Sequence, residues 1–458
     1  MGTGARAYRL TLIGRGWAPF LATSAALLLA PITALALPTF AQQTGYACTQ
    51  CHTISYGPAL TAYGREFKLN GYVFGETPSK LPVALMMQGG FTRTSADEPE
   101  PAARHFEEND NASVDQVGLF VAGRMSEHVG AFAQFTYGGE ARHFHWDNTD
   151  IRYARSFTLG GKGVVAGISL NNNPTVQDLW NSTPGWGFPY IPSGLGPTPN
   201  ASPLIGALAQ TVAGATAYAM IDNRFYLELG GYRGLSDRWL NNVGLYPANN
   251  PHMTGVSPYV RATLQFAPPG HHYYSVGAFG LDSHLQPDPT INAKDRYTDI
   301  GIDATYQYAS NSAHSLAVNA SAIRENRHLD SSFTNGLSDS ASSHMETVRF
   351  DASYTYDLTW GTALAAFDTH GDTNVALYGA APLTGSAIGS PNSQGYVLQA
   401  EYIPFGKLQS FGHPYLNVRV GLQYTGYTKF NGGTTNYDGF GRNASANNTL
   451  FAFVWVII

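Results

Sequence analysis

The stretch "VRFDASYTY", Val348 to Tyr356, alternates apolar and polar residues with a period of two. Successive side chains of a β-strand point to opposite faces, so the apolar residues share one face and Arg349 and Asp351 lie on the other. The same alternation recurs in "LNVRVGLQYT", Leu416 to Thr425, and again between Thr298 and Tyr308. Runs of around ten residues are long enough for a tilted strand to cross a bilayer.

These strands have charges on one face and apolar or aromatic residues on the other. A soluble sandwich also alternates, but its strands average about five or six residues and its apolar face covers a core. After Lys80 no apolar run reaches the roughly 18 residues that a membrane helix needs. The pattern predicts an all-β fold, a transmembrane antiparallel β-barrel with a polar inner face over residues 81–458.

The connections between the predicted strands alternate in length. Short turns follow most even-numbered segments, and long loops mostly follow the odd ones. This asymmetry is typical of outer-membrane barrels, and an even strand count places both termini in the periplasm. About sixteen segments are expected, beginning near Leu81, Asp115, Gly130, Trp146, Val164, Val212, Arg224, Val256, His272, Arg296, Ser315, Met345, Gly361, Gln394, Tyr415 and Thr449.

The first 36 residues have the composition of a secretory signal peptide. Three arginines precede an apolar run from Pro19 that ends in Ala34-Leu35-Ala36, which predicts cleavage after Ala36. Without these arginines, 23 of the 26 Lys+Arg remain against 32 Asp+Glu, a formal charge of −9. This acidic balance excludes nucleic acid as an expected partner.

The only two cysteines, Cys48 and Cys51, stand directly before His52 in "CTQCH". In an exported chain such a pair could form a small redox-active disulfide, bind metal or carry a cofactor. Zinc takes about four ligands, and this stretch offers three. Cys-x-x-Cys-His is the c-type haem attachment motif, in which two thiols add to the haem vinyl groups and the imidazole is the axial ligand of the iron. We therefore expect one covalent haem c, with His52 as its proximal ligand.

A family resemblance adds to this interpretation. The stretches "ALPTFAQQTGYACTQCH" and "PALTAYGREFKLNGY" resemble the fused outer-membrane cytochrome–porin family of iron-oxidising bacteria, closely from Leu37 to about Phe91 and beyond that only in architecture. The resemblance implies that residues 37–80 are a monohaem cytochrome c segment that plugs the barrel. It also implies electron transfer from an extracellular donor, ferrous iron in the iron oxidisers, to a periplasmic carrier such as a cytochrome c or a copper protein.

Further haem-binding residues are expected after the motif. Apolar residues fall at helical spacing from Ala59 to Leu69, with Pro58 at the first turn, and Arg65 and Lys68 are candidates for the haem propionates or else solvated charges. Met86 and Met87 lie on opposite faces of the first strand, so at most one faces inward. The family has a similar Leu-Pro-x-x-x-Met stretch, which favours Met86 as distal ligand. Simple packing by Met86, ligation by His105 and an open site are the alternatives.

Two extracellular features could attract a divalent cation. His143 and His145 share a strand face near a predicted turn, although rim residues look the same. The first long loop is acidic and offers hard oxygen ligands, although such a run is usually a solvated loop. Its acidic residues are Asp97, Glu98, Glu100, Glu107, Glu108 and Asp110.

The leading functional hypothesis is an outer-membrane conduit that oxidises extracellular Fe(II) through a single haem. One alternative is a conduit with another donor or the reverse direction of flow. Another is a diffusion porin whose haem plug has a structural or sensory role. Beyond the haem motif, the sequence offers no convincing set of acid–base or nucleophilic catalytic residues.

Overall fold

The computed structural model describes residues 39–54, 56–75, 82–246, 252–288, 290, 292–310, 313–407, 409–411 and 416–458. The chain divides into two compact units, Met1–Leu35 and Ala36–Ile458. The predicted signal peptide, residues 1–36, lies outside the described residues, as does the predicted boundary at residues 80 and 81. All of the described residues belong to the second unit.

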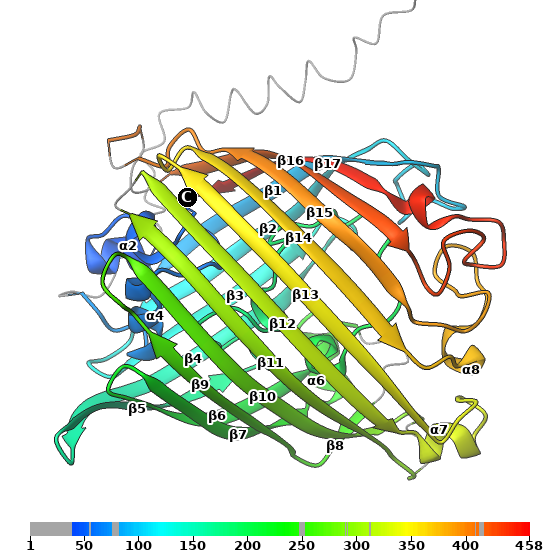
Figure 1. Ribbon diagram of the computed structural model, residues 1–458, viewed down its shortest axis with the longest axis horizontal. Coiled ribbons are helices and arrows are strands. Elements are labelled where there is room, and N and C mark those ends of the chain that lie inside the picture. Colours follow the sequence, from blue (N-terminus) through cyan, green and yellow to red (C-terminus); the bar gives the residue numbers. More distant parts are fainter. Residues whose placement is uncertain are drawn as a thin grey trace, which may run out of the picture. The chain divides into compact units, whose positions relative to one another are not determined.

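The strands form one closed antiparallel barrel (Figure 1). Each strand pairs with its neighbours in sequence, and β17 returns to pair with β1, Met86 opposite Ile457 and Thr94 opposite Thr449. β8 and β9 both pair with β7 and β10 around a break at residues 255 and 256, so the seventeen segments make sixteen strands. The predicted fold class and strand number are confirmed.

The strand boundaries lie within a few residues of the predicted ones. They are β1 Val83–Thr94, β2 Asn111–Arg124, β3 Val129–Gly138, β4 His143–Leu159, β5 Lys162–Asn171, β6 Val212–Ile221, β7 Phe225–Gly234, β8 His252–Thr254, β9 Ser257–Phe266, β10 His272–Gln286, β11 Asp295–Ser310, β12 His314–His328, β13 Ser342–Tyr356, β14 Trp360–Gly371, β15 Ser393–Tyr402, β16 Asn417–Lys429 and β17 Thr449–Ile457.

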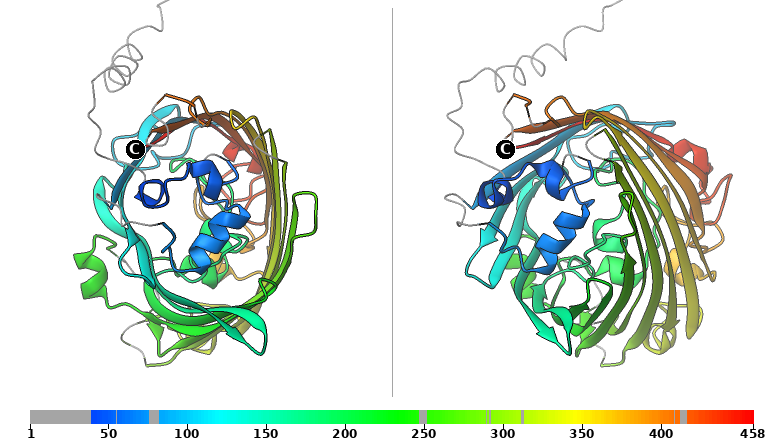
Figure 2. Two further views of the ribbon diagram at one scale, coloured as in Figure 1. Left: turned by 90° about the vertical axis from the view of Figure 1, so that its left-hand side faces the viewer. Right: turned by 60° about the vertical axis from the view of Figure 1, so that its left-hand side comes forward.

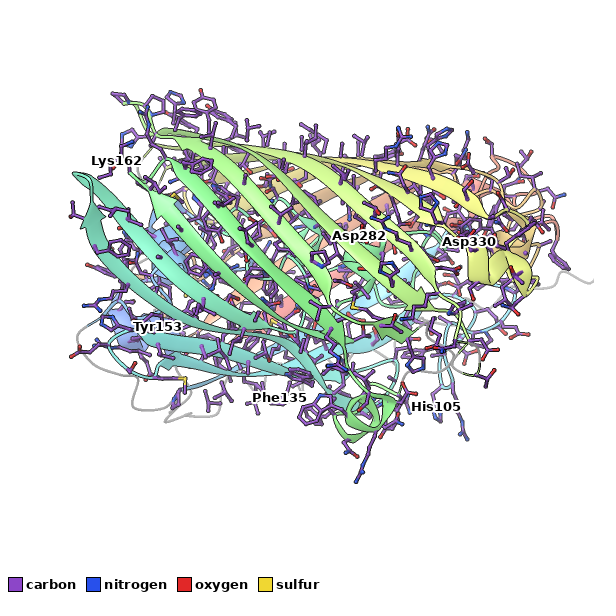
Figure 3. The ribbon with its side chains drawn as sticks, turned by 90° about the horizontal axis from the view of Figure 1, so that it is seen from below. His105, Phe135, Tyr153, Lys162, Asp282 and Asp330 are labelled. Carbon is purple, nitrogen blue, oxygen red and sulfur yellow. The ribbon has the colours of Figure 1, made fainter. Side chains whose placement is uncertain are left out.

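The two faces of the strands differ as the alternation predicts. On β11, Ile300 and Ile302 are 58% and 61% exposed on the outside, whereas Asp299 and Asp303 are 1% and 3% exposed on the inside. Aromatic side chains such as Phe135 and Tyr153 also cover the outside (Figure 3). An apolar exterior is stable only against lipid, so this is a membrane-spanning barrel of the outer-membrane type.

The loops divide the barrel into two ends. Short connections such as Asp222-Asn223, whose positive φ values of 50° and 51° form a tight reversal, lie at what we call the turn end. Long connections lie at the loop end, where Figure 1 shows α7 and α8. With an even number of strands, β1 begins and β17 ends at the turn end.

The helices are short and lie in the N-terminal segment and the long loops. None of the described helices is long and apolar enough to span a membrane. They are α2 Thr39–Thr44, α3 Cys48–Cys51, α4 Ala62–Leu69, η1 Pro184–Trp186, α5 Leu204–Ala207, α6 Asp237–Asn242, α7 Asp330–Thr334, α8 Val375–Tyr378 and η2 Ala444–Asn447.

Helices α2, α3 and α4 lie inside the ring of strands (Figure 2). We call residues 39–75 the plug. Its contacts reach several parts of the wall: Tyr56 donates a hydrogen bond to the Trp455 carbonyl oxygen at 2.6 Å, and Tyr218 donates one to the Leu69 carbonyl oxygen at 2.8 Å. The predicted small helical plug is therefore present.

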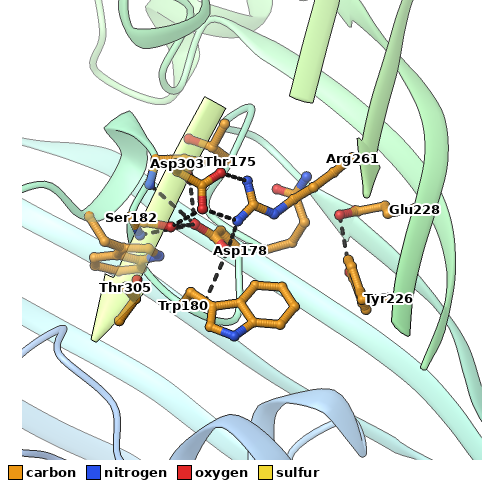
Figure 4. A network of polar contacts seen from close by, with 12 residues as sticks. Thr175, Asp178, Trp180, Ser182, Tyr226, Glu228, Arg261, Asp303 and Thr305 are labelled. Carbon is orange, nitrogen blue, oxygen red and sulfur yellow. Dashed lines mark hydrogen bonds and ion pairs between the residues drawn. The ribbon is translucent and has the colours of Figure 1, made fainter. Parts of the chain in front are cut away.

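A second segment also folds into the lumen. Residues 172–211, which we call the inward loop, connect β5 to β6, and Val176, Leu179 and Ile205 are at most 1% exposed. Asp178 of this loop lies 3.2 Å from Arg261 of β9, which also binds Asp303 of β11 at 2.8 Å (Figure 4). These ionic contacts hold the inward loop against the wall.

Candidate functional site

The cysteine–histidine motif forms a single turn of helix. The His52 amide donates to the Cys48 carbonyl oxygen at 2.9 Å, and His52 then takes an extended conformation that pairs with Leu60. Cys48 and Cys51 are free thiols. The two thiols and the imidazole all line one lumen cavity of about 400 Å³.

Helix α4 packs directly against this turn. It begins at Ala62 because Thr61 caps it, its hydroxyl accepting from the Gly64 amide at 3.1 Å. The predicted start at Pro58 and Ala59 is wrong, because residues 56–58 form a bend and Leu60 then pairs with His52. A Cβ atom at Gly64 would lie 2.2 Å from the Cys51 carbonyl oxygen, so this contact requires glycine.

We therefore expect Gly64→Ala to loosen α4 from the motif. The clash is with backbone and cannot be relieved by a rotamer change, so the cost should be about 1–3 kcal/mol. Limited proteolysis of the detergent-solubilised protein should show faster cleavage within the plug. Gly163→Ala, where no atom lies within 4 Å of the added Cβ, is the control. Equal cleavage of the two variants would mean that the close approach is dispensable.

The rest of the cavity wall comes mainly from the barrel near the turn end. Met86 belongs to a buried apolar cluster with Tyr56 and Trp455, and Cys48 packs against this cluster. Phe120 and Phe132 from neighbouring strands, together with Trp186 of the inward loop, also line the cavity. A mostly apolar pocket with a few polar groups is the usual form of a cofactor site.

The two methionines separate as predicted. Met86 is 5% exposed and lines the cavity, whereas Met87 is 40% exposed on the outer face. The thioether of Met86 is thus in the same cavity as the imidazole of His52. Its role as distal ligand stays a prediction.

Three polar atoms around the cavity have no hydrogen-bond partner among the described residues. They are His52 Nδ1, Asn181 Oδ1 and Trp455 Nε1. Asn181 and Trp455 are only 7% and 5% exposed. Unpaired buried polar atoms also occur elsewhere among the described residues, but a polar ligand in this cavity would give these three a partner.

Burial determines the protonation state of the two thiols and the imidazole of the motif. It raises the pKa of the Cys48 thiol to about 11 and that of the Cys51 thiol to about 12. It also lowers the pKa of the His52 imidazole to about 4. Near neutral pH the imidazole is therefore uncharged, as a metal ligand must be, and the thiols are protonated, unlike the reactive thiolate of a redox dithiol.

The donor set and the cavity fit a c-type haem. Two thiols, a neutral imidazole and a thioether surround an apolar space, and Trp455 Nε1 offers a hydrogen-bond donor for a propionate. A zinc site is less well supported, because the described residues contain no group of three or more His, Cys, Asp or Glu that could hold a metal ion.

Arg65, a predicted propionate ligand, lies against the barrel wall. Its Nη1 donates to Gln307 Oε1 at 2.6 Å and to the Leu60 carbonyl oxygen at 2.9 Å, and its guanidinium lies 3.7 Å from the ring centroid of Tyr273. It is 4% exposed and is not one of the residues that line the described cavity. These contacts give Arg65 a role in attaching the plug.

Lys68, the second predicted propionate ligand, does line the cavity. Its Nζ donates to the Val176 and Asp178 carbonyl oxygens at 2.7 and 2.6 Å, so it joins α4 to the inward loop. Burial lowers its pKa to about 7. The propionate role of both residues stays a prediction beside these structural contacts.

The other candidate ligands lie elsewhere. His105 is exposed in the first long loop and does not line the described cavity. His143 Nε2 and Nδ1 lie 2.8 and 3.0 Å from carbonyl oxygens, which leaves neither nitrogen for a metal shared with His145. The acidic side chains of residues 97–110 form no metal-holding group among the described residues.

Most residues of the cavity wall were missed from the sequence, and Trp455 and Asn181 are two of them. Trp455 shares the inner face of the closing strand with Phe451 and Phe453, and an aromatic face opposite an aliphatic one was an available signal. Nothing in the sequence around Asn181 predicts that it lines the cavity. Its position depends on the inward loop folding back against the plug, where the Asn181 side chain donates to the Pro58 carbonyl oxygen.

No protein-family model matches the sequence, and no curated protein is similar to it. Three solved porins are similar over 82% of this chain. They are an anion-selective porin from Comamonas acidovorans (10% identity, 98% of that chain, TM-score 0.45), OprB from Pseudomonas putida (10%, 92%, 0.46) and OmpF from Salmonella typhi in complex with daunomycin (13%, 97%, 0.45). The assignment as a barrel rests on the strand pairing and burial described above.

Proposed function

We propose that this protein is an outer-membrane electron-transfer protein in which Cys48 and Cys51 hold one haem c and His52 is its proximal ligand. Both chain ends would lie in the periplasm. Electrons would come from an extracellular donor, ferrous iron first, and pass to a periplasmic carrier such as a cytochrome c or a copper protein. The proposal agrees with the resemblance to the fused cytochrome–porin family.

One observation carries the proposal. Cys48, Cys51, His52 and Met86, which come from the plug and from β1, line the same apolar cavity. A porin has no need of a thiol pair and an imidazole around a cavity in its lumen. When bound, haem would supply one-electron chemistry by cycling between the ferrous and ferric states.

The chain's own residues would set the conditions for that chemistry. His52 is neutral and available as a ligand, and Met86 offers the thioether that raises a haem potential. The aromatic side chains of Phe120, Phe132 and Trp455 would exclude water, which disfavours the more highly charged ferric state.

The position of the cavity suggests where each partner acts. Ala84, two residues into β1, and Ile457, at the end of β17, both line it, so it lies toward the turn end. The carrier would dock at this end. The donor would approach through the lumen from the loop end, because a single haem cannot bridge roughly 30 Å of hydrocarbon.

A diffusion porin with a haem plug is the second candidate. The closed barrel favours it, as does a second lumen cavity of about 470 Å³ between the inward loop and strands β12–β16. Polar residues such as Asn319 and Asp351 line this cavity.

The deciding experiment is a redox-titrated absorption spectrum of the purified protein in detergent. Ferrous iron at acidic and at neutral pH should rapidly reduce a covalently bound haem with a high midpoint potential. A liposome-swelling assay tests the second candidate in parallel. Absence of haem, or a haem that stays ferric while solutes pass freely, would reject electron transfer from iron in favour of a porin or another donor.

A further inference from the structure

A buried ion pair in the barrel wall stands directly behind the proposed haem cavity. Arg419 of β16 contacts Glu401 of β15, with Nη2 and Nε lying 2.5 and 3.1 Å from Glu401 Oε2. The side chains are 1% and 2% exposed. Gln399 also donates to Glu401 Oε2 at 3.1 Å, so the carboxylate is held from two directions.

The other side of the guanidinium faces the plug. Arg419 Nη1 donates to the Tyr56 carbonyl oxygen at 3.2 Å and would lie 3.1 Å from a Cβ atom at Gly57. The guanidinium carbon lies 4.8 Å from the ring centroid of Trp455. Tyr56, Gly57 and Trp455 all line the cavity, so one layer of residues separates the charge from it.

The ion pair has a definite orientation relative to the cavity. Nη1 points to the cavity wall, whereas Nε and Nη2 hold Glu401, so the positive charge stands between the carboxylate and the cavity. Water does not screen a pair as buried as this one.

Stability alone is a weak explanation for such a pair. The free energy needed to desolvate two charges is about as large as the free energy gained from their attraction. Apolar residues of similar volume often stabilise a protein equally well. Its orientation toward a cavity that holds the motif suggests an electrostatic role.

We propose that Arg419, held in place by Glu401, is a positioning residue that raises the reduction potential of the haem bound by Cys48, Cys51 and His52. This inference rests on the proposed function, since it needs the haem to be present. Loss of an electron adds one positive charge to the haem, and a nearby guanidinium makes that loss more costly. The ferrous state is stabilised as a result.

The test is a spectroscopic redox titration of the full-length protein carrying neutral substitutions. Glu401→Gln leaves the positive charge of Arg419 without its counter-ion and should raise the midpoint potential of the haem. Arg419→Gln leaves the negative charge of Glu401 without its counter-ion and should lower the midpoint potential. Each change should alter the ferrous-to-ferric ratio at fixed ambient potential at least tenfold, which is 59 mV for one electron.

Matched variants separate charge from structure. The Arg419→Gln/Glu401→Gln double variant should have a potential between those of the two single variants and below wild type, because the positive end of the pair is nearer the cavity. Arg419→Lys, which keeps the charge, should stay near the wild-type potential. Glu325→Gln removes a carboxylate from another buried pair, Arg327–Glu325, which is remote from the described cavity lining, and should leave the potential unchanged. If Arg419→Gln does not assemble, the Glu401→Gln and double variants still test both signs.

The possible outcomes separate this inference from the proposed electron-transfer function on which it rests. A wild-type protein without covalent haem would overturn both. A protein with haem that iron reduces, but whose potential does not respond to Glu401→Gln, would overturn this inference and leave the proposed function standing. Shifts of the same sign in both single variants would indicate a structural effect and overturn it as well.

Discussion

A Cys48→Ala/Cys51→Ala variant should assemble as a barrel and carry no covalent haem. The thiols are the only two in the chain, so no other side chain can form the thioether bonds. Electron transfer from ferrous iron should fall to the background rate, a loss of several orders of magnitude. The barrel should survive because its sixteen strands close through backbone pairing that does not involve the motif. A haem stain on a denaturing gel and the absorption spectrum measure the loss.

Single variants refine this result. His52→Ala should leave the thiols able to react but remove the proximal ligand, so the spectrum should change even where some haem is attached. His105→Ala, an exposed histidine in a loop, is the matched control and should behave as wild type. A double cysteine variant that still bore covalent haem, or reduced at the normal rate, would show that the motif has another purpose.

Met86→Leu should lower the midpoint potential of the haem, because it removes the proposed distal ligand of the iron. The shift should be far larger than the 59 mV expected for the Arg419 and Glu401 variants. A leucine has nearly the volume of methionine and preserves the packing against Cys48 and Trp455, so the cost in stability should stay below about 1.5 kcal/mol. It lacks the thioether, which as an axial ligand raises a haem potential. A redox titration and the low-spin to high-spin change in the spectrum measure the effect.

The next residue provides the control for this substitution. Met87→Leu changes the same side chain on the lipid-facing side of the same strand, where 40% of the residue is exposed. It should alter neither the potential nor the spectrum. If Met86→Leu also left both unchanged, Met86 would be packing only, and the sixth ligand would be another group or a solvent molecule.

The barrel was predictable because each strand repeats the same alternation of apolar and polar residues. A period of two must place charges such as Asp299 and Asp303 on the face opposite Ile300 and Ile302, whatever the rest of the chain does. The same rule placed Met86 and Met87 on opposite faces, and the family resemblance favoured Met86 as the one that faces inward. Strand boundaries moved by a few residues, and the segment expected near Val256 begins at His252 with a break, because Gly255 takes a φ of 75°.

The contacts of the plug were not predictable, because they come from distant parts of the chain. Nothing near Lys68 in sequence indicates that the carbonyl groups of Val176 and Asp178 will receive its hydrogen bonds. Arg65 likewise meets Gln307 of β11. The local pattern predicts the helix and its charges, but the inward loop determines whether a charged side chain faces the cavity or the barrel wall.

The seam between β1 and β17 imposes an order on biogenesis. Residues at both ends of the barrel sequence, from Ala84 and Met86 to Trp455 and Ile457, complete the cavity, so the cavity exists only after the last strand has paired with the first. The motif lies near the start of the chain, and N-terminal segments are made first. Once the seam is shut, Cys48 of α3 packs against the cluster that contains Met86, Tyr56 and Trp455. If the motif binds haem as proposed, attachment before the seam closes would meet Cys48 without this cluster packed against it.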